Sequence, residues 1–315
     1  MPSKAQGSIH LFRVKGIDLF LHWSWFVVAI FEIRGGMGTY SSVIWNVLEY
    51  LALFLIVLLH EFGHAFACRS VGGVANRILL WPFGGVAYVN PPQRPGAMLW
   101  SIAAGPLVNV VLFPLLLGVF LLAKANGWSA SMHDEYVFVR TVLWIDLGLL
   151  IFNMMPVYPL DGGQILRSLL WFVLGRGRSL MVATILGFVG IVGFFVLAAV
   201  QGSFWLAAIG VFMLLNCWGG LQHARQLLKM AKLPRRPGYA CPSCRTAPPI
   251  GEFWGCRQCG KSFDTFETRS VCPHCSAQYM VTTCLDCGVS RPQAEWVTDP
   301  VAASGAVLGS SAARS

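Results

Sequence analysis

Charged residues are scarce in this sequence. Asp, Glu, Lys and Arg together make up 12 % of its 315 residues, whereas 56 % are hydrophobic. Because a soluble domain typically has about a quarter of its residues charged, this composition excludes a wholly soluble globular protein. Several apolar stretches approach or exceed the roughly 20 residues that cross a bilayer. Most of the chain is therefore predicted to lie in a membrane.

Acidic residues are scarcer than basic residues. Fourteen Asp and Glu against 23 Lys and Arg give a net charge of +9. In a soluble protein this excess would suggest nucleic-acid binding, but here the basic residues flank the apolar stretches.

No cleavable signal peptide is expected at the N-terminus. The mixed polar start, residues 1–15, is followed by an apolar run that lacks a small-residue cleavage site. That run is predicted to remain as a helix.

The apolar pattern predicts an α-helical multi-pass membrane protein with about six spanning helices. Residues 9–21 are interpreted as either a short strand or an interfacial segment, and glycines and prolines in residues 72–92 indicate a membrane-inserted hairpin or re-entrant loop. A short amphipathic helix is expected at residues 164–174. The predicted spans are residues 19–33, 43–68, 97–123, 140–155, 180–200 and 204–218.

The distribution of basic residues predicts the orientation in the membrane. If the N-terminus is cytoplasmic, the inner segments hold fourteen Lys or Arg, and the outer segments hold only Arg34, Lys124 and Arg140. Because inner segments are enriched in Lys and Arg, both termini are predicted to be cytoplasmic.

A His-Glu-x-x-His motif lies in the second predicted span. On a helix, His60 and His64 share one face and can present two imidazoles to one metal, with Glu61 beside them. Ionisable groups inside a membrane segment are costly and mark a functional site. The motif therefore predicts a catalytic zinc centre with Glu61 as general base.

The third zinc ligand must come from another span at the same depth. With the predicted topology the second and fourth spans run in the same direction, and His60 and Pro156 each lie roughly 24–25 Å from the outer ends of their helices. Asp161, just after the helix break, is the favoured third ligand, and Asp146 is the alternative. Three protein ligands leave a position for water, whose proton Glu61 would accept.

Two asparagines are candidates for a further role in catalysis. Asn109 or Asn153 could donate a hydrogen bond to the developing oxyanion. Either is equally suited to satisfying broken backbone inside the helix bundle.

These motifs resemble the site-2 proteases, intramembrane zinc metalloproteases that cut transmembrane substrates. The resemblance covers residues 9–219, without a PDZ-like segment or a paired nucleotide-binding repeat. It rests on four motifs: His60-Glu61-Phe62-Gly63-His64-Ala65, Phe83-Gly84-Gly85-Val86-Ala87, Ala104-Gly105-Pro106-Leu107-Val108-Asn109, and Asn153 through Gly163.

The resemblance implies His60, His64 and Asp161 as zinc ligands and Glu61 as catalytic base. It also implies a six-helix membrane domain and cleavage of a membrane-anchored substrate, such as an anti-sigma factor or similar regulator. Gly84 and Gly85 would belong to a membrane-inserted hairpin that meets the substrate as an added strand.

Eight cysteines in the C-terminal part form four C-x-x-C knuckles separated by 11, 12 and 8 residues. This spacing predicts two structural zinc sites, and the expected reducing cytoplasm disfavours disulfides. Sequential pairing of the knuckles is expected, with cross-braced pairing as the alternative. Cys68 and Cys217, near span ends, are interpreted as small apolar residues. The predicted ligands are Cys241, Cys244, Cys256, Cys259, Cys272, Cys275, Cys284 and Cys287.

Four segments are therefore expected: a protease domain (1–220), a basic juxtamembrane linker (221–240), a double zinc ribbon (241–296) and a disordered tail (297–315). The ribbons carry equal numbers of acidic and basic residues, so nucleic acid is not the expected ligand. A cytoplasmic protein partner is expected instead, with the linker lying against anionic lipid.

The leading hypothesis is an intramembrane zinc protease of a prokaryotic cell membrane. A non-catalytic membrane scaffold or metal carrier that presents the ribbons is the alternative, but it would not require Glu61. A membrane-tethered nucleic-acid binder is disfavoured by the neutral charge of the ribbons.

Overall fold

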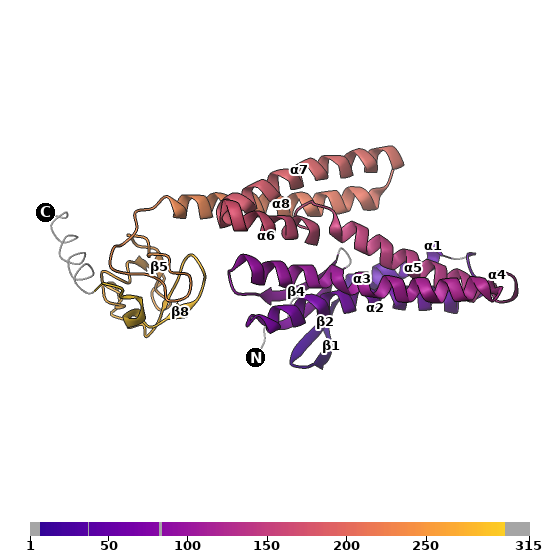
Figure 1. Ribbon diagram of the computed structural model, residues 1–315, viewed down its shortest axis with the longest axis horizontal. Helices are drawn as coiled ribbons and strands as arrows, with labels where there is room; N and C mark the ends of the chain where they lie inside the picture. The colour runs from indigo at the N-terminus through magenta and orange to yellow at the C-terminus, as the bar shows by residue number, and fades with distance from the viewer. Residues whose placement is uncertain (1–6, 37, 82–83, 300–315) are drawn as a thin grey trace. The chain divides into compact units, whose positions relative to one another are not determined.

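The computed structural model describes residues 7–36, 38–81 and 84–299. The chain divides into two compact units, Met1–Ala224 and Arg225–Ser315, each with its own core. Figure 1 shows the first unit as a helical assembly with a small sheet and the second as a loop-rich module.

Within the described residues, five helices are long and apolar enough to cross a membrane, which confirms a multi-pass membrane protein. They are α2 (Val43–Ser70), α3 (Pro95–Ala125), α5 (His133–Met154), α7 (Arg176–Gln201) and α8 (Phe204–Ala231). Helices α7 and α8 run back along each other (Figure 1) and pack through Ile191, Met213 and Cys217.

The first of the six predicted spans is not among these five. Its residues divide between strand β2 (Ile17–His22) and helix α1 (Ser24–Gly35). Twelve helical residues reach only about 18 Å, which is short of the bilayer core. The prediction was wrong here because β2 is buried: Ile17, Leu19 and Leu21 pack in the core, and a buried strand is as apolar as a helix.

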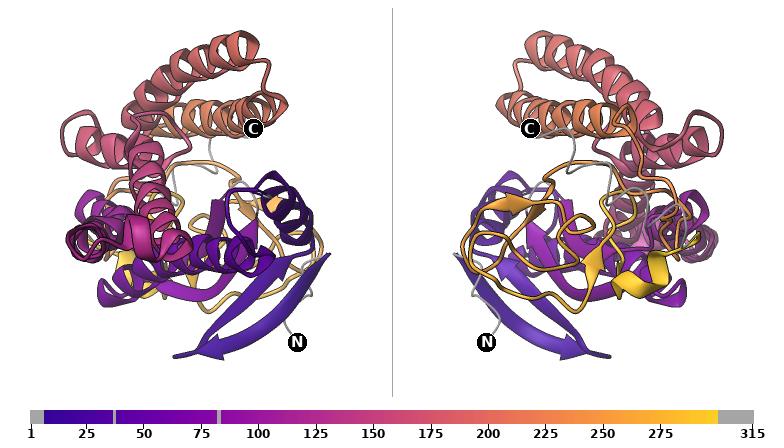
Figure 2. Two further views of the ribbon diagram at one scale, coloured as in Figure 1. Left: turned by 90° about the vertical axis from the view of Figure 1, so that its right-hand side faces the viewer. Right: turned by 90° about the vertical axis from the view of Figure 1, so that its left-hand side faces the viewer.

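A four-stranded sheet accompanies the helices of the first unit. Strand β1 (Ser8–Val14) pairs antiparallel with β2, β2 pairs parallel with β3 (Val74–Trp81), and β3 pairs antiparallel with β4 (Gly84–Asn90). This confirms both the strand alternative for residues 9–21 and the predicted hairpin. Figure 2 shows the β1–β2 hairpin projecting beyond the helices. The core of the sheet packs against α2 through Leu58, Ala65 and Cys68.

Helices α2 and α5 run in the same direction, as the topology predicted. The backbone N–H of Ser41, just before α2, donates a hydrogen bond of 3.1 Å to Asp134 in the first turn of α5. The connection after α5 passes through Met155–Leu160 and enters α6 (Asp161–Leu174), the predicted amphipathic helix. A four-residue helix, α4 (Trp128–Ser131), precedes α5.

The second unit is built from two small hairpins. Strand β5 (Trp254–Gly255) pairs with β6 (Ser262–Phe263), and β7 (Thr282–Thr283) pairs with β8 (Ser290–Arg291). A 3-10 helix, η1 (Gln293–Trp296), places the Trp296 ring in the core against Phe266.

The predicted basic linker is largely structured. Helix α8 continues to Ala231, and the next two arginines belong to the second unit. Arg235 pairs with Asp286 at 2.7 Å, and Arg236, 2 % exposed, pairs with Asp264 at 2.6 Å. The expectation that these two arginines lie against lipid was therefore wrong, because carboxylates of the ribbons neutralise them. Most of the predicted disordered tail, residues 300–315, lies outside the described residues.

Candidate metal centres

Helix α2 places the His-Glu-x-x-His motif in its last third. The helix begins at a Ser42 cap, whose hydroxyl accepts a hydrogen bond from the Ile44 N–H, and continues for 28 residues. His60, Glu61 and His64 are all buried, and one ligand atom from each lies within 4.8 Å of the others.

Asp161 completes a three-atom cluster with the two imidazoles. Its Oδ2 lies 3.0 Å from His60 Nε2 and 3.3 Å from His64 Nε2, and the two Nε2 atoms are 3.1 Å apart. Three tetrahedral zinc ligands at ordinary bond lengths would be spaced about 3.4 Å apart. The three side chains therefore fit one zinc ion.

The far nitrogens of both imidazoles are held by acceptors. His60 Nδ1 donates to Asn109 Oδ1 at 2.7 Å, and His64 Nδ1 donates to the Ser101 carbonyl oxygen at 2.9 Å. A proton on each Nδ1 leaves the lone pair of each Nε2 pointing toward the Asp161 carboxylate. Three electron-rich atoms that face one another at this spacing suit a bound cation, so the chemistry of the donor set also fits a metal.

Asp146 fixes the orientation of Asn109 and does not reach the metal ligands. Asn109 Nδ2 donates to Asp146 Oδ1 at 2.7 Å, and both side chains are fully buried. A carboxylate accepts hydrogen bonds, so the Asn109 NH₂ must face Asp146 and its Oδ1 must face His60. Asp146 thus lies one hydrogen bond behind Asn109, where it can position His60, whereas Asp161 is the carboxylate that contacts both imidazoles.

Glycine at position 105 is required by the closeness of α3 to the two imidazoles. A Cβ atom there would overlap the His64 ring and lie 2.7 Å from His60 Nε2. Gly63 plays the matching part on α2, where a Cβ would lie 2.6 Å from the Ala104 carbonyl oxygen. These two glycines let the α2 and α3 backbones approach at the depth of the metal ligands.

The loop between α5 and α6 carries Asp161 back to this site. Gly162 and Gly163 follow it immediately, and a Cβ on either would meet the backbone of the returning loop at about 2.5 Å, at Met155 and at Tyr158 respectively. Close packing therefore explains the two glycines at the end of the Pro-Leu-Asp-Gly-Gly sequence. The glycines allow the start of α6 to fold against the end of α5.

The remaining predicted positions are Asn109, Asn153, Gly84 and Gly85. The Asn109 side chain is hydrogen-bonded to both His60 and Asp146. Asn153, half-buried near the end of α5, has no side-chain hydrogen bond to any described residue. Gly84 and Gly85 begin β4 and pair with Trp81 and Leu80 across the hairpin. Sequence reasoning missed the roles of Ser101, Asp146 and Gly105. The only available signal was the presence of polar residues and glycine within apolar helices.

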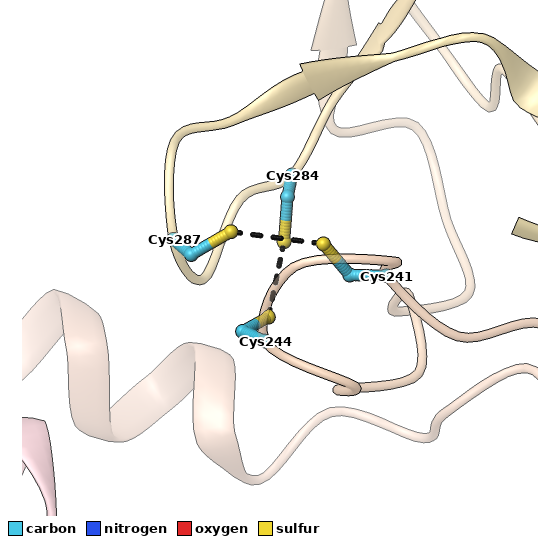
Figure 3. Close-up of side chains that lie close together, drawn as sticks. All are labelled: Cys241, Cys244, Cys284 and Cys287. Carbon is cyan, nitrogen blue, oxygen red and sulfur yellow. Dashed lines mark hydrogen bonds between the residues drawn. The ribbon is translucent and has the colours of Figure 1, made fainter. Parts of the chain in front are cut away.

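The cysteines of the second unit form two separate groups. In the first, shown in Figure 3, Cys241 and Cys244 of one loop point toward Cys284 and Cys287 of another. The Sγ atoms of Cys241 and Cys287 are 3.7 Å apart, as are those of Cys244 and Cys284. Four sulfurs bound tetrahedrally to zinc would be about 3.8 Å apart, so this group fits zinc.

The second group joins Cys256, Cys259, Cys272 and Cys275. Its sulfurs are 3.5 Å apart for Cys256 with Cys275 and 3.7 Å for Cys259 with Cys272. The Tyr279 hydroxyl donates to Cys256 Sγ at 3.0 Å and lowers the pKa of that thiol to about 5, which favours the thiolate that a metal needs.

The knuckles are nested, and the expected sequential pairing was wrong. The first knuckle groups with the fourth and the second with the third. The outer two are brought together because both flank one shared core, in which Trp296 and Phe266 pack beside Cys241 and Cys284. The spacing of the knuckles along the chain does not reveal that the first and fourth pack on the same core.

All four knuckles share one backbone conformation. In each, the N–H of the residue four after the first cysteine donates to that cysteine's carbonyl oxygen, and that residue has a positive φ. The φ values are 59° at Arg245, 74° at Gly260, 60° at Ser276 and 74° at Gly288. The common turn aims both thiols of each knuckle to one side.

Two imidazoles and a carboxylate around one point, with a glutamate beside them, form the centre of a zinc hydrolase. Here the same set of groups lies among long apolar helices, an arrangement that fits the class of membrane zinc metalloproteases.

Comparison with known proteins agrees with this class. The family model "Peptidase family M50" matches residues 49–131 and 118–197. A zinc metalloprotease of Methanocaldococcus jannaschii is 34 % identical over 180 residues, which cover 57 % of this chain and 50 % of that protein. Stage IV sporulation protein FB of Bacillus subtilis is 29 % identical over 161 residues, covering 48 % and 49 %.

Among solved structures, the site-2 protease from Methanocaldococcus jannaschii aligns with 68 % of this chain and 95 % of its own, at 27 % identity and a TM-score of 0.49. The chain spans about half of the length of the curated relatives described above. The chain is therefore similar to peptidase family M50 over residues 49–197.

Proposed function

We propose that this protein is an intramembrane zinc metalloendopeptidase that cuts a peptide bond in or near the transmembrane segment of a membrane-anchored substrate. The observation that carries the proposal is the convergence of His60 Nε2, His64 Nε2 and Asp161 Oδ2 within 3.3 Å of one another, beside Glu61 and within a helix long enough to cross a membrane. A scaffold or metal carrier would not need the glutamate.

The bound zinc, Glu61 and Asn153 have separate roles in the proposed hydrolysis. Zinc, when bound, supplies a Lewis acid that activates water and polarises the scissile carbonyl. The Glu61 carboxylate accepts the proton of the attacking water and returns it to the nitrogen of the leaving amine. Asn153 has no side-chain hydrogen bond to a described residue, so its amide can donate to the developing oxyanion. Burial keeps bulk water from these groups.

Strand β4 suits the substrate's approach. It is the last strand in the sheet order β1-β2-β3-β4, so one of its edges faces no other strand of the described residues. A substrate segment that leaves its helical conformation can pair with this edge through its backbone. Gly84 and Gly85, which begin β4, present no side chain to obstruct that approach.

Location and partners complete the proposal. The protein is placed in a prokaryotic cell membrane with both termini in the cytoplasm, as the excess of inner basic residues favours. The substrate is a membrane-anchored regulator such as an anti-sigma factor. The zinc ribbons bind a cytoplasmic protein partner, because their balanced charge does not favour nucleic acid.

Glu61→Gln in the full-length protein tests the mechanism. The amide preserves the shape of the side chain and removes the base, so the variant should retain its membrane zinc and lose cleavage of a model transmembrane substrate. Glu49→Gln, on the same helix but hydrogen-bonded to Tyr40, should remain active. Retention of turnover by Glu61→Gln would exclude the proposed mechanism.

A further inference from the structure

Arg167 on α6 is a buried cation without an acidic partner among the described residues. Its side chain is 9 % exposed, and its Nε is buried with no hydrogen-bond partner. No acidic residue in the described part of the chain lies within ion-pair distance of it. A buried charge without a counter-charge lowers the stability of the folded state. The protein therefore retains an arginine here against a stability cost.

The surroundings of Arg167 add further positive charge. Arg176 is the first residue of α7, and both guanidinium groups lie over one ring: the Cζ atoms of Arg167 and Arg176 are 5.9 Å and 5.8 Å from the centre of the Trp171 ring. Both arginines also act electrostatically on His223 of α8. The positive end of the 26-residue α7 dipole points to the same place.

The group that faces Arg167 does not neutralise it. Tyr158 is the phenol that interacts with Arg167, but an ordinary tyrosine is uncharged at neutral pH. Two guanidinium groups thus converge from α6 and α7 at the N-terminus of α7, and both act electrostatically on His223 of α8. Such an arrangement is complementary to an anion with several acceptor oxygens.

We propose that Arg167, Arg176 and His223 bind the phosphate group of an anionic lipid at the α6–α7 junction. A guanidinium fork matches two phosphate oxygens, and α7 offers its first backbone N–H groups to the same anion. Trp171 is of the type that favours the headgroup level of a bilayer. Leu169, Phe172 and Val173 on α6 are exposed and suit the acyl chains.

The site is distinct from the metal centre but linked to it. Arg167 follows the ligand Asp161 by six residues, which places it about 9 Å further along α6. Tyr158, which Arg167 faces, lies in the loop that carries Asp161. A bound phosphate would therefore stabilise α6 and this loop.

Thermal unfolding of the full-length protein in nanodiscs tests the proposal. The bilayers compared are phosphatidylcholine alone and phosphatidylcholine mixed with phosphatidylglycerol. Anionic lipid should raise the unfolding temperature of the wild type. In Arg167→Met this increase should vanish, and the amount of phosphatidylglycerol retained on the purified protein should fall on the order of tenfold.

The sign of the effect in neutral lipid separates a binding site from a structural arginine. In phosphatidylcholine alone, Arg167→Met should be at least as stable as the wild type, because the substitution removes an unpaired buried charge. Arg178→Met is the matched control: Arg178 lies two residues from Arg176 but is less buried than Arg167. It should keep the full response to anionic lipid.

Each other outcome decides between sources or against the site. If inorganic phosphate added to neutral nanodiscs produces the same Arg167-dependent increase, the anion site is correct and its ligand is soluble phosphate. If Arg167→Met lowers the unfolding temperature equally in both bilayers, or responds to phosphatidylglycerol as the wild type does, the proposal is wrong.

Discussion

At the scale of single residues, the membrane metal site depends on what lies behind each imidazole. His60 and His64 direct Nε2 toward Asp161, the third candidate ligand, because their Nδ1 atoms donate to Asn109 and to the Ser101 carbonyl. The two acceptors differ in kind. The backbone carbonyl cannot rotate, whereas the Asn109 amide can, and the buried Asp146 carboxylate removes that freedom.

Gly105→Ala should weaken zinc binding at the membrane site and lower its zinc content. The added methyl group would overlap the His64 ring and crowd His60 Nε2, and neither ring can turn aside without breaking its Nδ1 hydrogen bond. Breaking the hydrogen bond that orients a ligating imidazole typically weakens metal affinity by about 10–100-fold. Zinc content of the purified full-length protein measures the effect.

Gly118→Ala is the control for that substitution. Gly118 lies on the same helix, α3, and a methyl group added there would have nothing within 4 Å. It should keep its zinc and gain up to about 1 kcal/mol of helix stability. If Gly105→Ala binds zinc as the wild type does, the close approach of α3 to the imidazoles is not required.

The sequence was sufficient to predict that the three candidate zinc ligands lie together, but not which groups orient them. His60 and His64 are related by helix periodicity, and Asp161 by its depth in a parallel helix, so elementary geometry brings these three together. The contacts of Asn109, Asp146 and Gly105 depend on the rotation of α3 and α5 about their axes, which a uniformly apolar sequence does not specify.

At the scale of elements, the long helices were predictable and the shorter pieces were not. Length and hydropathy identify α2, α3, α5, α7 and α8 without knowledge of their packing. The division of residues 17–35 into β2 and α1 is decided by pairing of β2 with β1 and β3. Such pairing is non-local, and periodicity alone cannot reveal it.

The nested arrangement of the knuckles leads to a test by cysteine reactivity. In Cys241→Ser, the three remaining thiols of its group, Cys244, Cys284 and Cys287, should become reactive toward an alkylating reagent because their zinc is weakened. The four thiols of the other group should stay protected. Mass spectrometry of labelled peptides from the full-length protein reads both groups in one experiment.

Cys272→Ser provides the reciprocal experiment. It should expose Cys256, Cys259 and Cys275 and leave the outer group protected. Sequential pairing would give a different pattern, in which Cys241→Ser exposes Cys256 and Cys259. That result would contradict the nested arrangement.

At the scale of the whole molecule, two units rely on metal in different ways. The membrane unit places its candidate ligands among long apolar helices, with His60 and His64 buried, so its fold is not expected to depend on zinc alone. The second unit has two-residue strands and a core composed largely of cysteines and aromatic rings. Small modules of this kind draw most of their folding free energy from the metal.

Zinc counting should show that the two kinds of site are independent. The full-length protein is expected to bind three zinc ions. Asp161→Asn replaces an anionic oxygen by a weak neutral ligand and should leave two ions, without proteolytic activity and with all eight knuckle cysteines still protected from alkylation. Asp134→Asn is the control. Asp134 lies in the first turn of α5 and accepts a hydrogen bond from Ser41, so this variant should keep three ions.

Three ions in Asp161→Asn would remove this residue from the ligand set. Loss of zinc from the ribbons as well would mean that the two units do not fold independently, against the separate core of each.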